Sequence, residues 1–230
     1  TGNADLTTEC AHVARNLIWQ TDGKTYARRS LRDDETEAGH GAVNLTSAFT
    51  HSCNVYFARA GIALGRPPLA DAAARLEIGF PAPDAVDAAL PETAIGQGKL
   101  LVSPMAMARA AAAVANDGKL PALRWRRDDR ESAPPRQALE PEEAHRLSAL
   151  MARVCRSGTA AGRFDGLPFP VAGKTGTAQN ADGDRRPHGW FVGFAPVGGP
   201  RIAFAVVVEH GGYGAATAAP VARAMLEGSR

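Results

Sequence analysis

The last third of the 230-residue sequence places the strongest constraint on the fold. Three segments with strand-like composition follow one another there, at residues 171–178, 189–195 and 201–209, and turn residues separate them. The segment Pro196–Pro200 (PVGGP) lies between the last two and predicts a hairpin turn. Strands joined by connections this short pair antiparallel. A helix is expected at residues 218–226, after the last strand.

Helical patterns dominate the sequence before these strands. Asn44 and Ser103 are predicted helix caps, and Gly65 is a predicted helix stop. Helices are expected at residues 45–49, 55–64, 67–76, 103–115 and 140–156. Residues 1–40 are predicted to be polar and irregular, and within them the mixed-charge run at residues 27–34 is predicted to be a solvated loop or hairpin. Residues 79–98 are predicted to be a long loop.

Helices followed by an antiparallel meander and a closing helix indicate an α+β fold, an antiparallel sheet flanked by helices with a helical subdomain. We expect one domain over residues 1–230, mostly helical over 40–170, with the sheet strands and the C-terminal helix in 171–230.

The charge and cysteine counts exclude several classes of protein. The 26 basic and 24 acidic residues leave a net charge of +2, so no nucleic-acid partner is expected. No apolar run is long enough to span a bilayer, so we expect membrane contact only through an anchor upstream of Thr1. The three cysteines, Cys10, Cys53 and Cys155, include no C-x-x-C pair, and no two histidines have a metal-ligand spacing. We therefore predict neither a disulfide framework nor a zinc site, and no metal or cofactor.

The most distinctive local motif is Gly173-Lys174-Thr175-Gly176-Thr177. A phosphate-binding P-loop needs a glycine five residues before its Gly-Lys pair, and that position holds Pro168. The P-loop also opens a helix after its lysine, whereas this pattern continues as a strand. The motif instead matches the Lys-Thr-Gly element of serine enzymes that react with penicillin, and Ser52-Cys53-Asn54 supplies their Ser-x-Asn element in the right order.

Other strings agree with these two motifs. The chain resembles the transpeptidase domain of penicillin-binding proteins, of the class B elongation or division type, over about residues 40–228. The remaining strings that carry this resemblance are His40-Gly41-Ala42-Val43-Asn44-Leu45, Val55-Tyr56-Phe57, Ala94-Ile95-Gly96-Gln97-Gly98 with Ser103-Pro104, Gly158-Thr159-Ala160, Ala178-Gln179, and Trp190-Phe191-Val192-Gly193-Phe194-Ala195-Pro196.

The chemistry of a peptide ending in D-Ala-D-Ala assigns roles to these motifs. Lys174 supplies a positive charge for the C-terminal carboxylate, the hydroxyls of Thr175 and Thr177 can donate hydrogen bonds to it, and Gly176 lets the substrate backbone approach the strand. The resemblance further implies that the backbone N–H of Thr177 is an oxyanion donor, that Ser52 relays a proton to the leaving group near Lys174, and that Asn54 binds a substrate amide.

These roles make Ser52, Asn54, Lys174 and Thr177 the expected catalytic residues, and Thr175, Gly176 and Thr177 the expected substrate-binding residues. We expect Ser52 to lie close to the Lys174 ammonium across a cleft. The alternative for Ser52 and Asn54 is a helix cap between two helices.

The resemblance also implies partners and a location. The ligands would be peptidoglycan stem peptides and β-lactam antibiotics, and the partners a glycosyltransferase or a cell-wall synthesis complex. The expected location is the extracytoplasmic face of the bacterial inner membrane.

The nucleophile of the family, the serine of Ser-x-x-Lys, is missing from these residues. The four lysines have Thr21, Gly96, Asn116 and Val171 three positions upstream, and none of these is serine. Thr21 precedes an Asp-Gly turn and a polar segment, so it is not expected to be the nucleophile. Two explanations stay open. The nucleophile helix lies upstream of Thr1, together with the first strands of the sheet, or this is a degenerate member of the family. In both cases the chain alone is expected to be inactive.

Two other functions share parts of these motifs. A class A β-lactamase needs a loop glutamate that activates water, and neither residues 91–93 nor 140–143 resemble that loop. A non-catalytic peptide-binding or sensor module would keep the carboxylate-binding strand without any nucleophile.

Residues 201–209 are apolar on both faces, which is typical of a central strand. Without an upstream strand, we expect residues 202–208 to self-associate or to be covered by residues 1–15.

Overall fold

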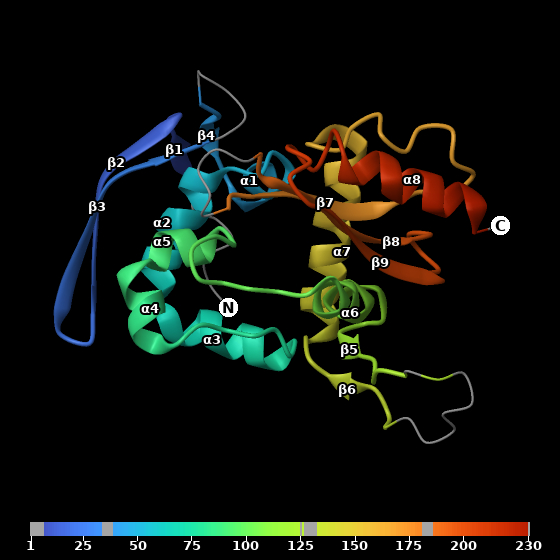
Figure 1. Ribbon diagram of the computed structural model, residues 1–230, viewed down its shortest axis with the longest axis horizontal. Coiled ribbons are helices and arrows are strands. Elements are labelled where there is room, and N and C mark those ends of the chain that lie inside the picture. Colours follow the sequence, from blue (N-terminus) through green and yellow to red (C-terminus); the bar gives the residue numbers. More distant parts are fainter. Residues whose placement is uncertain (1–6, 34–38, 125, 127–132, 181–185, 230) are drawn as a thin grey trace. The chain divides into compact units, whose positions relative to one another are not determined.

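The computed structural model describes residues 7–33, 39–124, 126, 133–180 and 186–229 (Figure 1). The chain divides into two compact units. Unit 1 consists of residues 1–74 and 79–101, and unit 2 consists of residues 75–78 and 102–230.

The helices and strands of unit 1 come first along the chain. They are β1 (Thr8–Cys10), β2 (Val13–Thr21), β3 (Lys24–Arg32), β4 (Gly41–Val43), α1 (Leu45–Thr50), α2 (Asn54–Leu64), α3 (Arg66–Arg75, whose last residue belongs to unit 2), α4 (Pro83–Ala88) and α5 (Leu90–Ala94). Those of unit 2 are α6 (Pro104–Ala115), β5 (Lys119–Leu120), β6 (Arg136–Gln137), α7 (Pro141–Ser157), β7 (Ala172–Ala178), β8 (His188–Ala195), β9 (Ile202–Val208) and α8 (Ala218–Gly228).

A long antiparallel hairpin occupies the N-terminal part of unit 1, where the sequence predicted irregular structure. Strands β2 and β3 pair from Val13↔Arg32 to Thr21↔Lys24. Asp22 and Gly23 both have positive φ (49° and 75°), as a two-residue hairpin turn requires, so the predicted turn is confirmed. The irregular assignment was wrong because the hairpin is exposed along most of its length, which makes its sequence polar.

The loop predicted at residues 79–98 is also wrong, since it contains α4 and α5. Each of these short helices has a proline in its first turn, where the missing N–H costs nothing. Helix α4 anchors the hairpin through Asp87, which is only 4% exposed. The Trp19 indole donates to the Asp87 carbonyl at 2.7 Å, and the Arg66 guanidinium donates to the Asp87 carboxylate at 2.9 Å.

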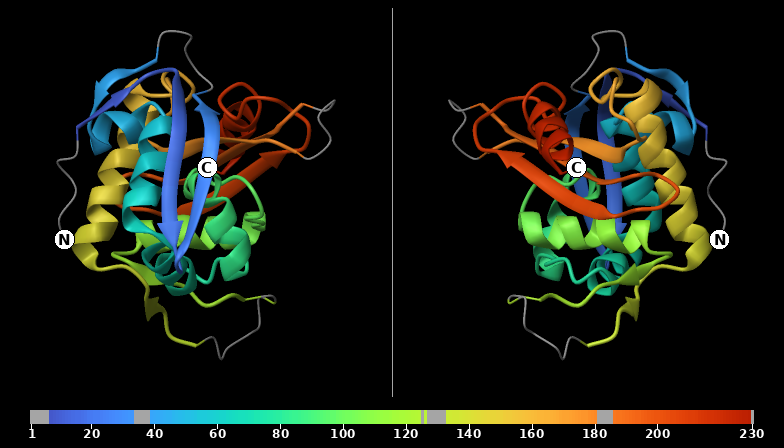
Figure 2. Two further views of the ribbon diagram at one scale, coloured as in Figure 1. Left: turned by 90° about the vertical axis from the view of Figure 1, so that its left-hand side faces the viewer. Right: turned by 90° about the vertical axis from the view of Figure 1, so that its right-hand side faces the viewer.

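The three strands predicted near the C-terminus are confirmed in unit 2. They form an antiparallel sheet in the order β7-β8-β9, so β7 and β9 are its two edges (Figures 1 and 2). Helix α8 lies against one face and α6 against the other. Phe191 is fully buried and packs against Phe164 and Phe204, with ring centroids 5.0 and 6.1 Å apart. This aromatic cluster fixes the middle strand of the sheet.

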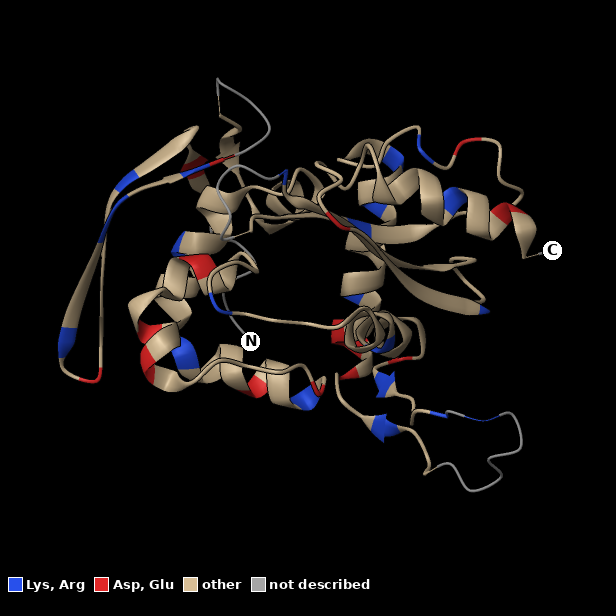
Figure 3. Ribbon diagram, viewed as in Figure 1, with Lys and Arg blue, Asp and Glu red and all other residues tan. Residues whose placement is uncertain are grey.

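Residues 75–78 belong to unit 2 because ion pairs attach them there. The Glu77 carboxylate lies 2.8 Å from the Arg109 guanidinium on α6 and 3.2 Å from that of Arg136 on β6. Hydrogen bonds from Arg109 and then Arg136 lower the pKa of the Glu77 carboxyl group. Elsewhere, acidic and basic residues occur over both units (Figure 3).

The far side of β9 has no strand partner among the described residues. The expectation that residues 1–15 cover this edge is wrong for the described part of that segment, because Thr8–Cys10 pairs with β4 and β2 pairs with β3. The predicted self-association through residues 202–208 stays a prediction.

We expect the isolated chain to associate through the free edge of β9, because its unpaired backbone groups lie on an apolar strand. Sedimentation velocity at increasing protein concentration is expected to show species larger than a monomer. Amide exchange over Ile202–Val208 is expected to slow in parallel. A monomer at every concentration with these amides already protected would contradict the prediction.

Candidate functional site

The Ser52-Cys53-Asn54 motif forms the tight junction between α1 and α2. Ser52 has a φ of 58°, in the left-handed region that residues other than glycine rarely occupy. The backbone N–H of Ser52 donates to the Phe49 carbonyl and that of Cys53 to the Ala48 carbonyl, at 3.3 and 2.9 Å. These bonds turn the chain sharply between the helices.

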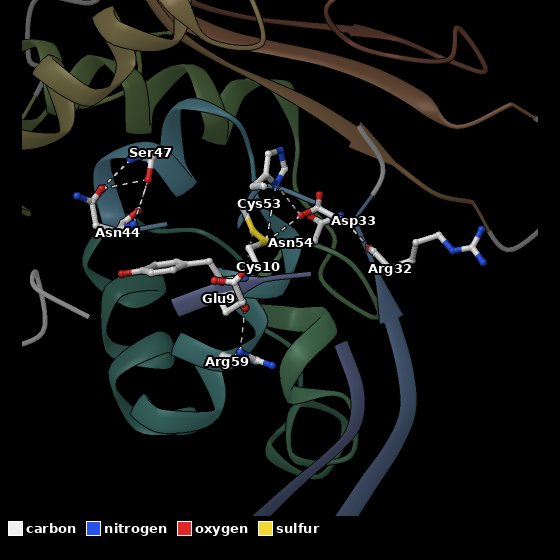
Figure 4. Close-up of a disulfide and its surroundings, with 11 residues drawn as sticks. Glu9, Cys10, Arg32, Asp33, Asn44, Ser47, Cys53, Asn54 and Arg59 are labelled. Atoms are coloured by element: carbon white, nitrogen blue, oxygen red, sulfur yellow. Dashed lines mark hydrogen bonds and ion pairs between the residues drawn. A yellow bond between two sulfur atoms is a disulfide. The ribbon is translucent and has the colours of Figure 1, made fainter. Parts of the chain in front are cut away.

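The cap of α2 is Cys53 rather than Ser52 or Asn54. Its sulfur lies 3.4 Å from the backbone nitrogen of Tyr56 and accepts that N–H. Asn54 is the first residue of the helix, and its side-chain amide donates to the Arg32 carbonyl at 3.4 Å (Figure 4). Ser52 and Asn54 are both partly exposed. The predicted cap at Asn44 is confirmed, since Asn44 and Ser47 bond reciprocally at 3.0 Å.

Cys53 also forms a disulfide with Cys10 of β1, and both residues are fully buried (Figure 4). The prediction that the cysteines form no disulfide framework is therefore wrong for this pair. The two cysteines are 43 residues apart in the sequence, so no local spacing indicates that they pair. Cys155 in unit 2 is a free cysteine.

Asp33 and His40 lie beside this disulfide. The Asp33 Oδ2 atom is 3.4 Å from Cys10 Sγ and 3.1 Å from His40 Nδ1. The side-chain donor atoms of Cys10, Asp33, His40 and Cys53 all lie within 4.8 Å of one another, so these four residues could hold a metal ion. Asp33 is fully buried, although the segment around it was predicted to be solvated. Its burial depends on the fold and left no signal in the sequence.

In unit 2, the Lys174-Thr175-Gly176 motif lies on the edge strand β7. Side chains alternate along a strand, so Lys174 and Gly176 share one face and Thr175 and Thr177 share the other. Lys174 is half-buried, and its ammonium donates to the Thr175 carbonyl at 3.0 Å. Among the residues that the structure describes, β8 is the only strand that pairs with β7, so the other edge of β7 could pair with an extended peptide.

The two threonines of the motif have different environments. Thr175 is buried, and its hydroxyl bonds to the Thr159 hydroxyl at 2.5 Å. Thr177 is half-buried. Thr159 follows the end of α7, so this hydroxyl pair fastens the motif to the helix that packs beside it. The string Gly158-Thr159-Ala160 is visible in the sequence, but nothing in it indicates which residue Thr159 contacts.

Gly176 lies close to the neighbouring strand. It pairs with Trp190 of β8, and a Cβ atom at position 176 would lie 3.1 Å from the Trp190 Cβ atom. Close packing between β7 and β8 therefore favours glycine at this position, independently of any substrate.

Cys155 of α7 packs against β7, and its thiol is a poor nucleophile. Burial raises the pKa of the Cys155 thiol to about 12, although a hydrogen bond with the Gly173 backbone opposes the shift. The thiol is therefore protonated at neutral pH, and a protonated thiol is a poor nucleophile.

The predicted site residues fall in both units. Ser52 and Asn54 belong to unit 1, whereas Lys174, Thr175, Gly176 and Thr177 belong to unit 2. The predicted approach of Ser52 to the Lys174 ammonium stays a prediction. Thr21 lies in unit 1 at the end of β2, where its hydroxyl donates to the Asp87 carboxylate at 3.2 Å.

Comparisons with known proteins agree with the two motifs. The family model of the penicillin binding protein transpeptidase domain matches residues 8–227. The chain therefore belongs to this family.

The peptidoglycan D,D-transpeptidase PbpA of Mycobacterium tuberculosis is 33% identical to the chain over 215 residues, which cover 80% of the chain and 43% of the relative. MrdA of Salmonella typhimurium, also a peptidoglycan D,D-transpeptidase, is 26% identical over 243 residues, covering 84% of the chain and 39% of the relative. Among solved structures, penicillin-binding protein A from M. tuberculosis in a ceftriaxone acyl-enzyme complex matches with a TM-score of 0.80 and 28% identity, over 99% of this chain and 56% of that one.

The chain thus spans less than half the length of these two curated relatives. The predicted α+β transpeptidase fold is confirmed by the solved structures that it matches. Over the residues that the structure describes, no helix combines the length and apolar character that a membrane span needs.

We expect Thr159→Val to destabilise unit 2, because the buried Thr175 hydroxyl would lose its partner. Leaving such a group unpaired costs about 1–3 kcal/mol of unfolding free energy. Thr159→Ser keeps a hydroxyl at this position and serves as the matched control, expected to recover most of the loss. Urea unfolding followed by circular dichroism measures both variants. Equal stability of Thr159→Val and the parent chain would contradict the assignment.

Proposed function

We propose that this chain is the part of a peptidoglycan D,D-transpeptidase that binds the stem peptide and positions groups for acyl transfer. The observation that carries the proposal is the Lys-Thr-Gly motif on the free edge of β7, in a chain that matches the transpeptidase family over residues 8–227. An edge strand can pair with an extended peptide, and a lysine beside it can bind the C-terminal carboxylate of that peptide.

The proposed roles follow the motif positions. Lys174 holds the D-Ala carboxylate, and the Thr177 hydroxyl assists it. Thr177 is half-buried, whereas Thr175 is buried and its hydroxyl is bonded to that of Thr159. We therefore assign Thr175 to supporting the strand and Thr177 to the direct contact. The backbone N–H of Thr177 stabilises the oxyanion, Ser52 relays the proton to the leaving amine, and Asn54 binds a substrate amide. Gly176 keeps the approach to the strand open.

The nucleophile is proposed to be a Ser-x-x-Lys serine outside these 230 residues, since no serine here precedes a lysine by three positions. Attack by that serine on the penultimate D-Ala carbonyl would release D-Ala and form an acyl-enzyme, which the amine of a second stem peptide would resolve. β-Lactams would acylate the same serine. The proposed location is the extracytoplasmic face of the membrane, where the substrate lies, in contact with other cell-wall synthesis proteins.

The second candidate, a non-catalytic module that only binds stem peptides or β-lactams, rests on the same missing serine. Covalent labelling separates the two functions, because only an enzyme forms an acyl adduct. We expect fluorescent penicillin to label the gene product covalently when it is applied to the protein in its source cell. Absence of any label would favour the binding module.

We expect the chain to bind a pentapeptide ending in D-Ala-D-Ala, and to bind the C-terminally amidated peptide at least tenfold more weakly, because the amide removes the charge that Lys174 recognises. Lys174→Met is expected to abolish this preference. Lys119→Met removes an exposed lysine of β5 and is the matched control. Isothermal titration calorimetry measures both variants. An unchanged preference in Lys174→Met would show that the carboxylate binds elsewhere.

The 230-residue chain alone should remain unmodified by labelled penicillin, since binding without a nucleophile leaves no covalent bond. Intact-mass spectrometry after incubation checks this. A stable adduct, above all one mapped to Thr21, would show that the nucleophile lies inside these residues.

A further inference from the structure

The β2–β3 hairpin of unit 1 carries an excess of positive charge. Its two strands have nine residues each, and together they contain five basic side chains but neither Asp nor Glu. The whole chain is nearly balanced, with 26 basic and 24 acidic residues. All five basic residues are exposed, and Figure 3 shows basic residues on both strands. They are Arg15 of β2 and Lys24, Arg28, Arg29 and Arg32 of β3.

Pairing between the strands fixes which side chains face outward near the open end of the hairpin. Ala14 pairs with Leu31, and both are buried, so this face of the ribbon lies against the core of unit 1. Arg15 pairs with Ser30, one position further toward the turn. Because side chains alternate along a strand, these two residues lie on the opposite, outward face, and both are exposed.

Two further arginines share this outward face. Arg28 and Arg32 lie two positions before and after Ser30 on β3, so both are diagonal neighbours of Arg15 across the ribbon. Diagonal neighbours in an antiparallel pair are about 7–8 Å apart, which is within reach of long side chains. Three guanidinium groups can therefore meet above the Ser30 hydroxyl.

One of the three guanidinium groups is already held in place. Arg28 Nε donates to the Ser30 carbonyl at 3.0 Å, and Arg28 Nη1 pairs with the Glu92 carboxylate of α5. Among the residues that the structure describes, no acidic side chain pairs with Arg15 or Arg32. Like charges this close to one another repel, so a bound anion is expected to stabilise the outward face.

We propose that Arg15, Arg28, Ser30 and Arg32 form a binding site for a phosphate group. A guanidinium group can donate two parallel hydrogen bonds to phosphate oxygens, and a serine hydroxyl can donate another. A phosphate monoester has three acceptor oxygens and about two negative charges, so it suits three arginines better than a single carboxylate does. The site lies within unit 1, and the inference does not rest on the proposed function.

The site adjoins the Ser-x-Asn motif through the end of β3. The Asn54 side-chain amide donates to the Arg32 carbonyl at 3.4 Å, while the Arg32 side chain extends away from Asn54 (Figure 4). A phosphate held by Arg32 would therefore restrain the backbone that Asn54 contacts. The site would attach unit 1 to a phosphate-bearing molecule beside a predicted catalytic residue, without occupying that residue.

Titration calorimetry at low ionic strength tests the proposal, because exposed charges are least screened there. The probe is inorganic pyrophosphate, and citrate is a carboxylate probe of similar charge. We expect one pyrophosphate per chain, bound about tenfold more tightly than citrate, because phosphate oxygens fit more of the donors. Equal affinity for the two probes would overturn the assignment to phosphate.

Matched variants separate a built site from simple charge attraction. Arg15→Gln and Arg32→Gln each remove one proposed donor and are expected to weaken pyrophosphate binding about tenfold. Arg29→Gln removes an exposed arginine from the opposite face of β3, changes the net charge equally, and is expected to change binding less than about twofold. Circular dichroism checks that the three variants fold like the parent chain. An equal loss of affinity in Arg29→Gln would overturn the site.

Vesicles distinguish the two sources of phosphate, a lipid headgroup and a free phosphate compound. Co-sedimentation uses vesicles of phosphatidylglycerol, with phosphatidylcholine as the control that has no net charge. Vesicle binding that Arg15→Gln and Arg32→Gln lose and Arg29→Gln keeps would assign the site to a lipid headgroup. Pyrophosphate binding without vesicle binding would assign it to a soluble phosphate compound. Binding of neither pyrophosphate nor vesicles would overturn the proposal.

Discussion

The pairing register between β7 and β8 is the constraint on which the strand that carries Lys174, Thr175 and Gly176 depends. It places Thr175 opposite Phe191 and Gly176 opposite Trp190, so the strand is held from the middle of the sheet. Phe191 is buried between Phe164 and Phe204 and cannot shift without opening the core of unit 2. A slip of one residue would exchange the faces of β7 and bury Lys174 in place of Thr175. The core therefore determines which side chains the edge strand can offer to a peptide.

In unit 1, the main structural constraint is the strained turn at Ser52 between α1 and α2. Ser52 adopts a left-handed conformation that ordinarily costs free energy, and the surrounding contacts must compensate for it. Cys53 supplies them in two ways, since its sulfur caps α2 and is bonded to β1. The residue in the middle of the Ser-x-Asn motif is therefore the structural centre of that motif.

The two motifs thus depend on unrelated interactions, which are an aromatic core in unit 2 and the Cys10–Cys53 disulfide in unit 1. Reduction of the Cys10–Cys53 disulfide is expected to loosen the Ser52 turn and to leave the Lys174 strand unchanged. Substitutions around Phe191 would do the opposite. Peptide affinity and proton transfer are expected to respond separately to such changes, because the first is proposed to depend on Lys174 and the second on Ser52.

The sequence by itself determined the family, the α+β fold class, the three-stranded sheet of unit 2, the helices α6, α7 and α8, and the two motifs. Each of these features depends on residues that are close together in the sequence. Examples are the helix cap at Asn44 and the turn at Pro196–Pro200 before β9. It left a loop or a hairpin open at residues 27–34 and did not predict the full β2–β3 hairpin, because most of its residues are exposed and polar. It also did not predict the helices that begin at Pro83 and Leu90. Only the tertiary structure decided that Cys10 meets Cys53, that Asp33 is buried beside His40, and that Thr159 holds Thr175. Such contacts join residues far apart along the chain, and packing of the whole unit selects them, so no local pattern encodes them.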